Sequence, residues 1–250
     1  MGHLDEEKKQ QIIDFILDHK DAYNDTPMGR DYYADRIEWE DYSSPPYISD
    51  FLIEGLSYRF EHPDVDNTYF NQLYSWFDCY PEGMDPYDQL LDKYEETYGP
   101  LKGKHIVEIG GGPVPALARK MAERMKDENG QIVGSITVYD PNYVETYPGI
   151  TFIPRKFDDD TEIDPNSELI AMMPCEGTKP VLTRFTQQFQ GMVQLCRCSK
   201  CQTAIRRDNP KYIVTRMHSR FSDTSVQIAY TTSDDFDSDE SFEKSEGRSR

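Results

Sequence analysis

The chain has 250 residues and a formal net charge of -19 at pH 7, with 37% hydrophobic residues. This length fits one large domain or one domain with an addition, and the acidic balance opposes binding to a polyphosphate backbone, so we do not expect nucleic acid as a partner. The sequence has no apolar run of membrane-spanning length, no signal-peptide core and an odd number of cysteines, 5, so we expect a cytoplasmic protein without a membrane partner.

The first part of the chain, residues 1–98, is predicted to be an all-helical cap rich in aromatic residues. Apolar side chains at helical spacing predict helices over 5–20, 48–60, 67–77 and 86–98. The rings either form a helical core or, in part, shape a pocket over a ligand site. The candidates for the pocket are Tyr42, Tyr47, Tyr74 and Trp76, and the sequence does not choose among them.

A strand, a glycine turn and a helix follow one another in the middle of the chain. An apolar run at 106–109 meets Gly110, Gly111 and Gly112, and a helix is predicted over 116–125. Glycine lets the backbone adopt a positive φ or pass close to a ligand. The new helix presents free N–H groups and the positive end of its dipole above the turn. This order is typical of a Rossmann-type ligand-binding turn.

A second strand is predicted over 135–140, and it ends in an acid, Asp140. A carboxylate at the tip of this strand can accept both ribose hydroxyls of an adenosine. An extra loop over 126–134 makes the spacing from Gly112 longer than the ~20 residues expected for such an acid. The alternative is an ordinary α/β turn with a solvated Asp, but the order of strand, glycine turn, helix, strand and acid favours a ligand.

Glu108, two residues before the first glycine, separates two Rossmann-type interpretations. A dinucleotide fingerprint needs a third glycine where this chain has Pro115, which disfavours a nicotinamide enzyme. Glu108-x-Gly110-x-Gly112 resembles motif I of the class I S-adenosylmethionine (SAM)-dependent methyltransferases, although Val114 replaces the last glycine of that motif. The resemblance implies SAM as cofactor, with Glu108 at its methionine end and the glycines beneath it.

The remainder of the chain completes an α/β pattern. Further strands are predicted over 150–156, 168–173, 192–197, 212–218 and 225–231, the last two as an antiparallel hairpin, with a helix over 178–190 that Gly191 caps. Seven strands in this order fit a Rossmann-like, mostly parallel methyltransferase sheet over residues 99–232. The acidic composition of 233–250 predicts a disordered tail.

The resemblance also places cofactor contacts after the later strands. Asn142, two residues after Asp140, is predicted to contact the cofactor. The resemblance implies that Asp158 receives the adenine amino group while Phe157 packs on the ring, and a solvated acidic loop is an equal alternative for Asp158. Pro174 is expected to form the backbone lip of the SAM pocket.

The segment Pro174-Cys175-Glu176-Gly177 stands where the family carries its motif IV, at the mouth that faces the transferring methyl group. Glu176 is a candidate base toward a substrate hydroxyl or amine. Cys175 is a candidate nucleophile, because the four residues are similar to the Pro-Cys-Gln-Gly of cytosine C5 methyltransferases. The simpler alternative is that Cys175 is a buried thiol.

Three further thiols lie within six residues, at Cys196, Cys198 and Cys201. Zinc takes four ligands, commonly as two close pairs. The candidates for a fourth ligand are Cys175, Asp208 and His218. Because the sequence has no second Cys-x-x-Cys, we expect reduced cysteines in and after a strand, and no metal.

These observations together predict SAM-dependent methyl transfer to a small molecule. The sulfonium of SAM carries its own leaving group, so the protein needs chiefly to align donor and acceptor and to accept a proton. This explains why no strong catalytic motif need be visible. The alternatives are a methyltransferase acting on nucleic acid or protein, and a non-catalytic module that binds a nucleotide or SAM. The sequence leaves the oligomeric state open.

Overall fold

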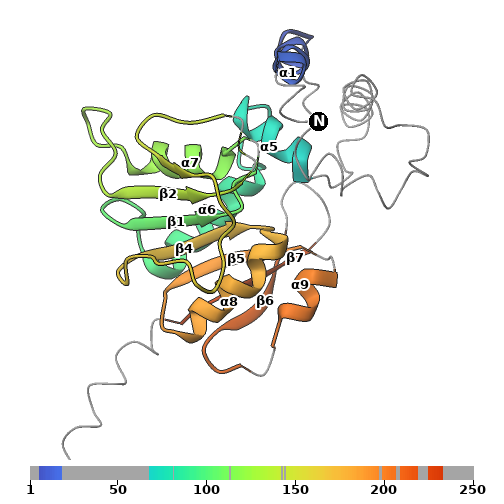
Figure 1. Ribbon diagram of the computed structural model, residues 1–250. Coiled ribbons are helices and arrows are strands. Elements are labelled where there is room, and N and C mark those ends of the chain that lie inside the picture. The colour runs from blue at the N-terminus through green and yellow to red at the C-terminus, as the bar shows by residue number, and fades with distance from the viewer. Residues whose placement is uncertain are drawn as a thin grey trace, which may run out of the picture.

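The computed structural model describes residues 6–18, 68–80, 82–112, 114–141, 143, 145–196, 199–206, 209–218 and 225–232 (Figure 1). Its helices are α1 (Glu6–Asp18), α5 (Thr68–Trp76), α6 (Pro86–Tyr98), α7 (Ala116–Met125), α8 (Thr178–Thr186) and α9 (Ser199–Ala204), with a 3-10 turn, η2 (Cys175–Gly177). Its strands are β1 (His105–Ile109), β2 (Ser135–Tyr139), β3 (Thr151–Ile153), β4 (Glu168–Met172), β5 (Gly191–Leu195), β6 (Ile213–His218) and β7 (Ser225–Tyr230). Several predictions lie outside the described residues, namely the helix over 48–60, the tail over 233–250, and the placements of Tyr42, Tyr47, Asn142, Cys198 and Asp208.

The strands form one seven-stranded sheet in the order β3-β2-β1-β4-β5-β7-β6. The first five strands of this order are parallel, and β7 runs antiparallel to both β5 and β6. The predicted Rossmann-like, mostly parallel sheet is therefore confirmed, and so is the closing hairpin. The chain moves outward from β1 to β3 and then returns to β4 on the other side of β1. This reversal makes a topological switch point, where α/β sheets of this kind bind ligands beyond the carboxyl ends of the strands.

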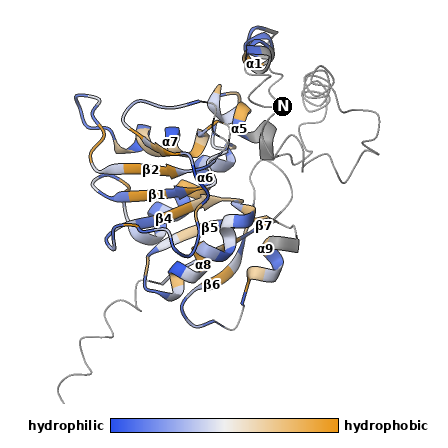
Figure 2. Cartoon of the chain, in the orientation of Figure 1, coloured by the Kyte–Doolittle hydropathy of each residue, from blue (hydrophilic) through white to orange (hydrophobic). Residues whose placement is uncertain are grey.

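The central strands β1, β4 and β5 are buried on both faces, to which successive side chains of each strand point alternately. Ile106, Ile136 and Ile170 belong to the core cluster that includes α6 and α7, whereas Val107 and Leu169 belong to the cluster that includes α8. Figure 2 shows hydrophobic residues on the strands between these helices. Strands buried on both faces read as near-continuous apolar runs, which is the pattern of β1 and β4.

Helix α6 packs against the sheet and contributes to its hydrophobic core, although its residues lie in the segment predicted as the cap. The Asp85 side chain accepts a hydrogen bond from the Tyr87 N–H at 2.8 Å, and Pro86 occupies the first turn. Arg124 of α7 pairs with Asp88 at 2.9 Å, which ties the two helices together. The division of the chain at residue 98 stays a prediction.

Helix α5 lies beside the first turns of α7. The Arg119 guanidinium donates to the Ser75 carbonyl at 3.1 Å. Two of the aromatic residues proposed for a pocket lie on α5. Tyr74 is 6% exposed, and Trp76 is half-buried with its ring edge-on to Tyr147 at 6.2 Å. Tyr74 therefore contributes to packing, as expected for most of the rings.

The prediction that Gly191 caps the preceding helix is wrong. Helix α8 ends at Thr186, and Gln188 takes the turn with a φ of 70°. Gly191 instead begins β5 beside Leu169 of β4, and a Cβ added at Gly191 would lie 2.1 Å from the Leu169 carbonyl oxygen. Glycine is needed here for the close approach of two strands and not for helix termination.

Helix α9, which follows β5, was not predicted. No helix in the described part of the chain is long and apolar enough to cross a bilayer.

Candidate functional site

The glycine loop and the turn after β4 meet across the switch point. A Cβ added at Gly110 would lie 3.1 Å from the Pro174 Cα atom, so the two backbones are in close contact. Gly110 has a φ of 75°, a conformation that a side chain would strain. The structure thus brings together the loop after β1 and Pro174, which the sequence predicted as the lip of the same pocket.

Asp140 holds the glycine loop from the end of β2. Its Oδ2 atom accepts a hydrogen bond from the Gly112 N–H at 2.8 Å, and the residue is 7% exposed. Asp140 is therefore at the predicted place, but part of its acceptor capacity already serves the backbone of the loop. Its contact with ribose hydroxyls stays a prediction.

Gln72 of α5 lies against the same loop and was missed by the sequence analysis. Its Nε2 atom donates to the Gly111 carbonyl at 3.0 Å. A Cβ added at Gly112 would be 2.2 Å from that Nε2 atom, so the packing of the protein itself requires glycine there. The available signal was weak, because it consisted of one polar residue beside Leu73 on a helix whose other buried residues are largely apolar.

Glu108 is the most unusual acid of the site. It is 2% exposed, and its Oε2 atom has no hydrogen-bond partner among the described residues. Burial, and then the nearby Asp140 carboxylate, raise the pKa of Glu108 to about 8, while a hydrogen bond from the Ala118 N–H opposes the shift. Gln72 Oε1 is also buried and has no partner in the described part of the chain. A glycine loop lined by two such acceptors favours a ligand that carries N–H or O–H donors and positive charge.

SAM fits this donor and acceptor arrangement. Its ammonium group supplies the donors that Glu108 Oε2 and Gln72 Oε1 lack, and Asp140 lies at the strand tip where a ribose is commonly bound. The same residues do not specify SAM alone, because other nucleotides carry a ribose.

The two residues predicted at the adenine have defined places in the structure. Phe157 is 5% exposed, and its ring meets Tyr139 edge-on at 5.5 Å in the core cluster that includes α8. Asp158 is exposed, and its Oδ1 atom accepts a hydrogen bond from the Thr161 hydroxyl at 2.7 Å. This hydrogen bond lowers the pKa of Asp158. Both side chains thus have structural roles, and their contacts with adenine stay predictions.

The turn after β4 exposes its two candidate catalytic residues. The Glu176 carboxylate accepts a hydrogen bond from Lys156 Nζ at 2.8 Å, and both side chains are exposed. Cys175 is exposed as well, so the buried-thiol interpretation is wrong. The physical reason is the geometry of the turn, in which Cys175 begins η2 with a φ of 45°, beyond the end of the sheet.

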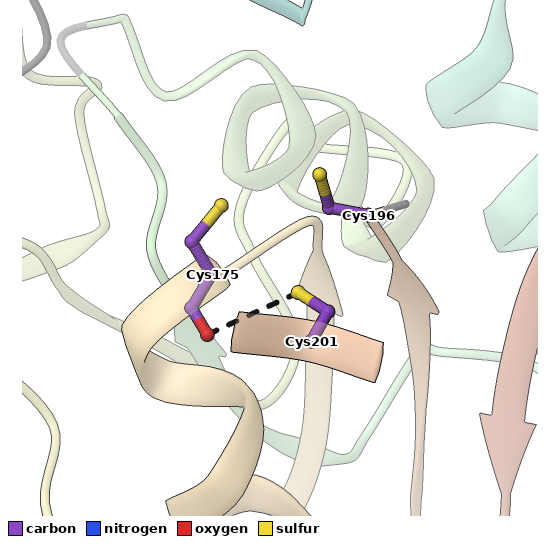
Figure 3. A group of neighbouring side chains, drawn as sticks. All are labelled: Cys175, Cys196 and Cys201. Carbon is purple, nitrogen blue, oxygen red and sulfur yellow. Dashed lines mark hydrogen bonds between the residues drawn. The ribbon is translucent and has the colours of Figure 1, made fainter. Parts of the chain in front are cut away.

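A cluster of thiols, Cys175, Cys196 and Cys201, forms at this edge of the sheet (Figure 3). The three Sγ atoms all lie within 4.8 Å of one another. From the sequence, Cys175 is only one of three candidates to join the other cysteines. Because β4 and β5 are parallel neighbours, their carboxyl ends bring residues together that are about twenty positions apart in the sequence.

No known family profile and no curated protein sequence matches the chain. Solved structures with a similar fold include a mutant of MtNAS in complex with S-adenosylmethionine, 13% identical, covering 90% of this chain and 97% of that chain with a TM-score of 0.43. Precorrin 8W decarboxylase from Methanobacterium thermoautotrophicum is 11% identical, covering 62% and 94%, with a TM-score of 0.40. The trans-methyltransferase CalH in complex with SAH is 14% identical, covering 92% and 74%, with a TM-score of 0.37.

Proposed function

We propose that this chain binds SAM and transfers its methyl group to a small molecule. One observation carries the proposal: two buried acceptor atoms without a partner among the described residues, Glu108 Oε2 and Gln72 Oε1, line the glycine loop at the switch point. A buried carboxylate with an elevated pKa in a ligand crevice is typical of a functional site. A motif of the methyltransferase type places the same Glu108 two residues before the loop.

The residues of the chain would hold the two ends of the cofactor. Glu108 and Gln72 would accept hydrogen bonds from the ammonium group, and Asp140 would accept them from the ribose. Pro174, in contact with Gly110, would limit the pocket on the side of β4. When bound, SAM supplies an electrophilic methyl group together with its leaving group, so the protein contributes alignment, exclusion of water and removal of a proton.

The acceptor would approach the turn after β4. Glu176 is the proposed base there, since it is exposed on η2 immediately after the Pro174 lip. Its ion pair with Lys156 keeps a cation beside the carboxylate, and that pair would open to admit a hydroxyl or an amine. A small-molecule acceptor agrees with the net charge of -19, which repels nucleic acid. Cys175 as a nucleophile toward a cytosine ring is the second candidate, and it rests on the four-residue similarity alone.

Calorimetric titration with SAM and S-adenosylhomocysteine tests the cofactor. We expect micromolar binding to the wild type and a loss of about tenfold or more, about 1.4 kcal/mol, in Asp140→Asn. Asparagine keeps an acceptor for the Gly112 N–H, so this variant separates loss of the carboxylate from collapse of the loop. Glu96→Gln, an exposed position on α6, is the control with the same change of charge. A folded protein that binds neither ligand contradicts the proposal and directs the search to nicotinamide and adenine nucleotides.

Transfer of a labelled methyl group tests the acceptor. The label should pass from SAM into members of a small-molecule panel, and not into bulk RNA, DNA or histone-like protein. Transfer into a macromolecule would support the alternative methyltransferase class. Binding of SAM without transfer to any acceptor would support a non-catalytic module.

A further inference from the structure

We propose that the cysteine cluster, Cys175, Cys196 and Cys201, binds a zinc ion through three thiolates. The proposal does not depend on SAM binding, because none of these side chains belongs to the oxygen acceptors around the glycine loop, although Cys175 shares its turn with Glu176, the proposed base. It also goes beyond the sequence, which led us to expect no metal.

The geometry of the three sulfur atoms suits a tetrahedral ion. A Zn–S bond of about 2.3 Å in a tetrahedral site places sulfur atoms about 3.8 Å apart. The three Sγ atoms here all lie within 4.8 Å of one another. A shift of about 1 Å, within reach of small side-chain rotations, therefore brings them to bonding positions. A disulfide would need two sulfurs at about 2.05 Å and would leave the third thiol out.

The three ligands come from separate elements that the fold holds in place. Cys175 begins η2 after β4, Cys196 directly follows β5, and Cys201 lies on α9 (Figure 3). The Gln202 side chain donates to the Cys196 carbonyl at 3.0 Å and to the Gln227 side chain at 2.9 Å, which fixes the end of β5 against β7. Such preorganisation lowers the entropic cost of gathering ligands around an ion.

The exposed fraction of the cysteines rises from Cys201 through Cys196 to Cys175, so one side of the cluster is accessible to a metal ion from solvent. Cys201 is 0% exposed, Cys196 is half-buried and Cys175 is exposed. The ion would thus be covered by protein on the side of Cys201 and would face solvent on the side of Cys175. Cys196 and Cys201 alone could be explained as packed thiols, but an exposed cysteine beside them could not.

A second observation at the cluster is a hydroxyl group that contacts one of the sulfurs. Thr178 is 0% exposed, and its Oγ1 atom lies 3.1 Å from the Cys201 Sγ atom. A hydroxyl in this position can donate to a thiolate, and such contacts orient and tune metal ligands.

The backbone of the turn gives a third indication. Met173 and Cys175 both have positive φ, 51° and 45°, and strained residues of this kind concentrate at functional sites.

Metal analysis of the full chain tests the proposal. After purification under reduction and loading with zinc, we expect one zinc ion per chain, and titration with Co²⁺ should produce thiolate-to-cobalt charge-transfer absorption. Cys175→Ser, Cys196→Ser and Cys201→Ser should each weaken zinc binding by about tenfold or more. Cys79→Ser, at a cysteine that follows α5, is the matched control and should retain the ion.

Thr178 provides a test that keeps all three thiols. Thr178→Val removes the hydroxyl with little change of shape and should weaken zinc binding about tenfold, whereas Thr178→Ser should bind like the wild type. This pair also serves if a cysteine variant fails to fold. A reduced, folded wild type that binds neither Zn²⁺ nor Co²⁺, or a disulfide within the cluster in the protein as isolated from cells, would overturn the proposal. SAM titration of the zinc-free protein reports on the proposed function separately.

Discussion

Two clusters at the same edge of one sheet differ in their chemistry and in how the chain assembles them. The oxygen cluster, made of Glu108, Asp140 and Gln72, lies at the glycine loop and is almost fully buried. The cysteine cluster lies at the ends of β4 and β5 and is exposed on one side. Oxygen acceptors match ammonium and hydroxyl groups, and thiolates match soft metal ions. One sheet edge can therefore carry two independent sites, each set by the residues that end its strands.

The clusters also differ in the strain they impose on the protein. A buried Glu108 with an elevated pKa destabilises the fold whenever it is charged, and a ligand has to compensate for that cost. The strain at the cysteine cluster lies instead in the backbone of its turn, where Met173 and Cys175 have positive φ.

Glu108→Gln should stabilise the ligand-free protein while weakening SAM binding. The pKa of Glu108 rises from 4.5 to about 8 on folding, so its contribution to stability is complete below pH 4.5 and is lost as the pH rises through 8. The variant lacks this loss, and at pH 8.5 it should gain at most about 5 kcal/mol in the free energy of unfolding, because a rise in pKa from 4.5 to about 8 corresponds to about 1.4 kcal/mol per pKa unit. Denaturant unfolding from pH 4.5 to 8.5 measures it. Parallel pH curves for the two proteins would contradict the assignment.

Gly112→Ala should cost about 2 kcal/mol of stability, more than the same change at Gly130. Its φ of 73° strains any side chain, and the new Cβ would displace Gln72. Gly130→Ala is the matched control, because its φ is 77° but nothing lies within 4 Å of the added Cβ. The excess over this control should shrink in a Gln72→Ala background. Equal costs at both glycines would show that the contact with α5 contributes nothing.

Asp158→Ala should weaken SAM binding about fivefold if the carboxylate receives the adenine amino group, the usual scale for one hydrogen bond. Thr161→Val removes the hydrogen bond that Asp158 accepts at 2.7 Å but keeps the carboxylate. This control should bind SAM almost normally in the same calorimetric assay. A similar loss in both variants would mean that the loop conformation, and not adenine recognition, explains the effect.

A substitution in one cluster should leave the ligand affinity of the other cluster almost unchanged, and this is the smallest effect that we expect. Asp140→Asn should change zinc affinity less than about twofold, and Thr178→Val should change SAM affinity equally little, because separate sites contribute additively. Titration of each ligand into both single variants and the double variant measures the coupling. A coupling beyond this would indicate that the two clusters form one site.

The sequence predicted most of the sheet because its signals are local. The bounds of α6, α7 and β1 follow from apolar periodicity and from Asp85, Pro86 and the glycines at the ends. It failed where a contact between distant strands decided the outcome. Gly191 looked like a helix cap, but the neighbouring strand β4 requires glycine there. The contact of Gln72 with the glycine loop could not be predicted from the sequence, because its partner, the Gly111 carbonyl, lies 39 residues away.

The sequence by itself determined the fold class and the two carboxylates beside the glycine loop, since Glu108, the glycines and Asp140 stand in the order that a strand-turn-helix-strand unit predicts. Only the tertiary structure decided that Cys175 joins Cys196 and Cys201, and that Asp140 holds the loop. The physical reason is that parallel neighbours end at the same edge of the sheet. Which strands become neighbours depends on packing across the whole molecule, which no short motif encodes.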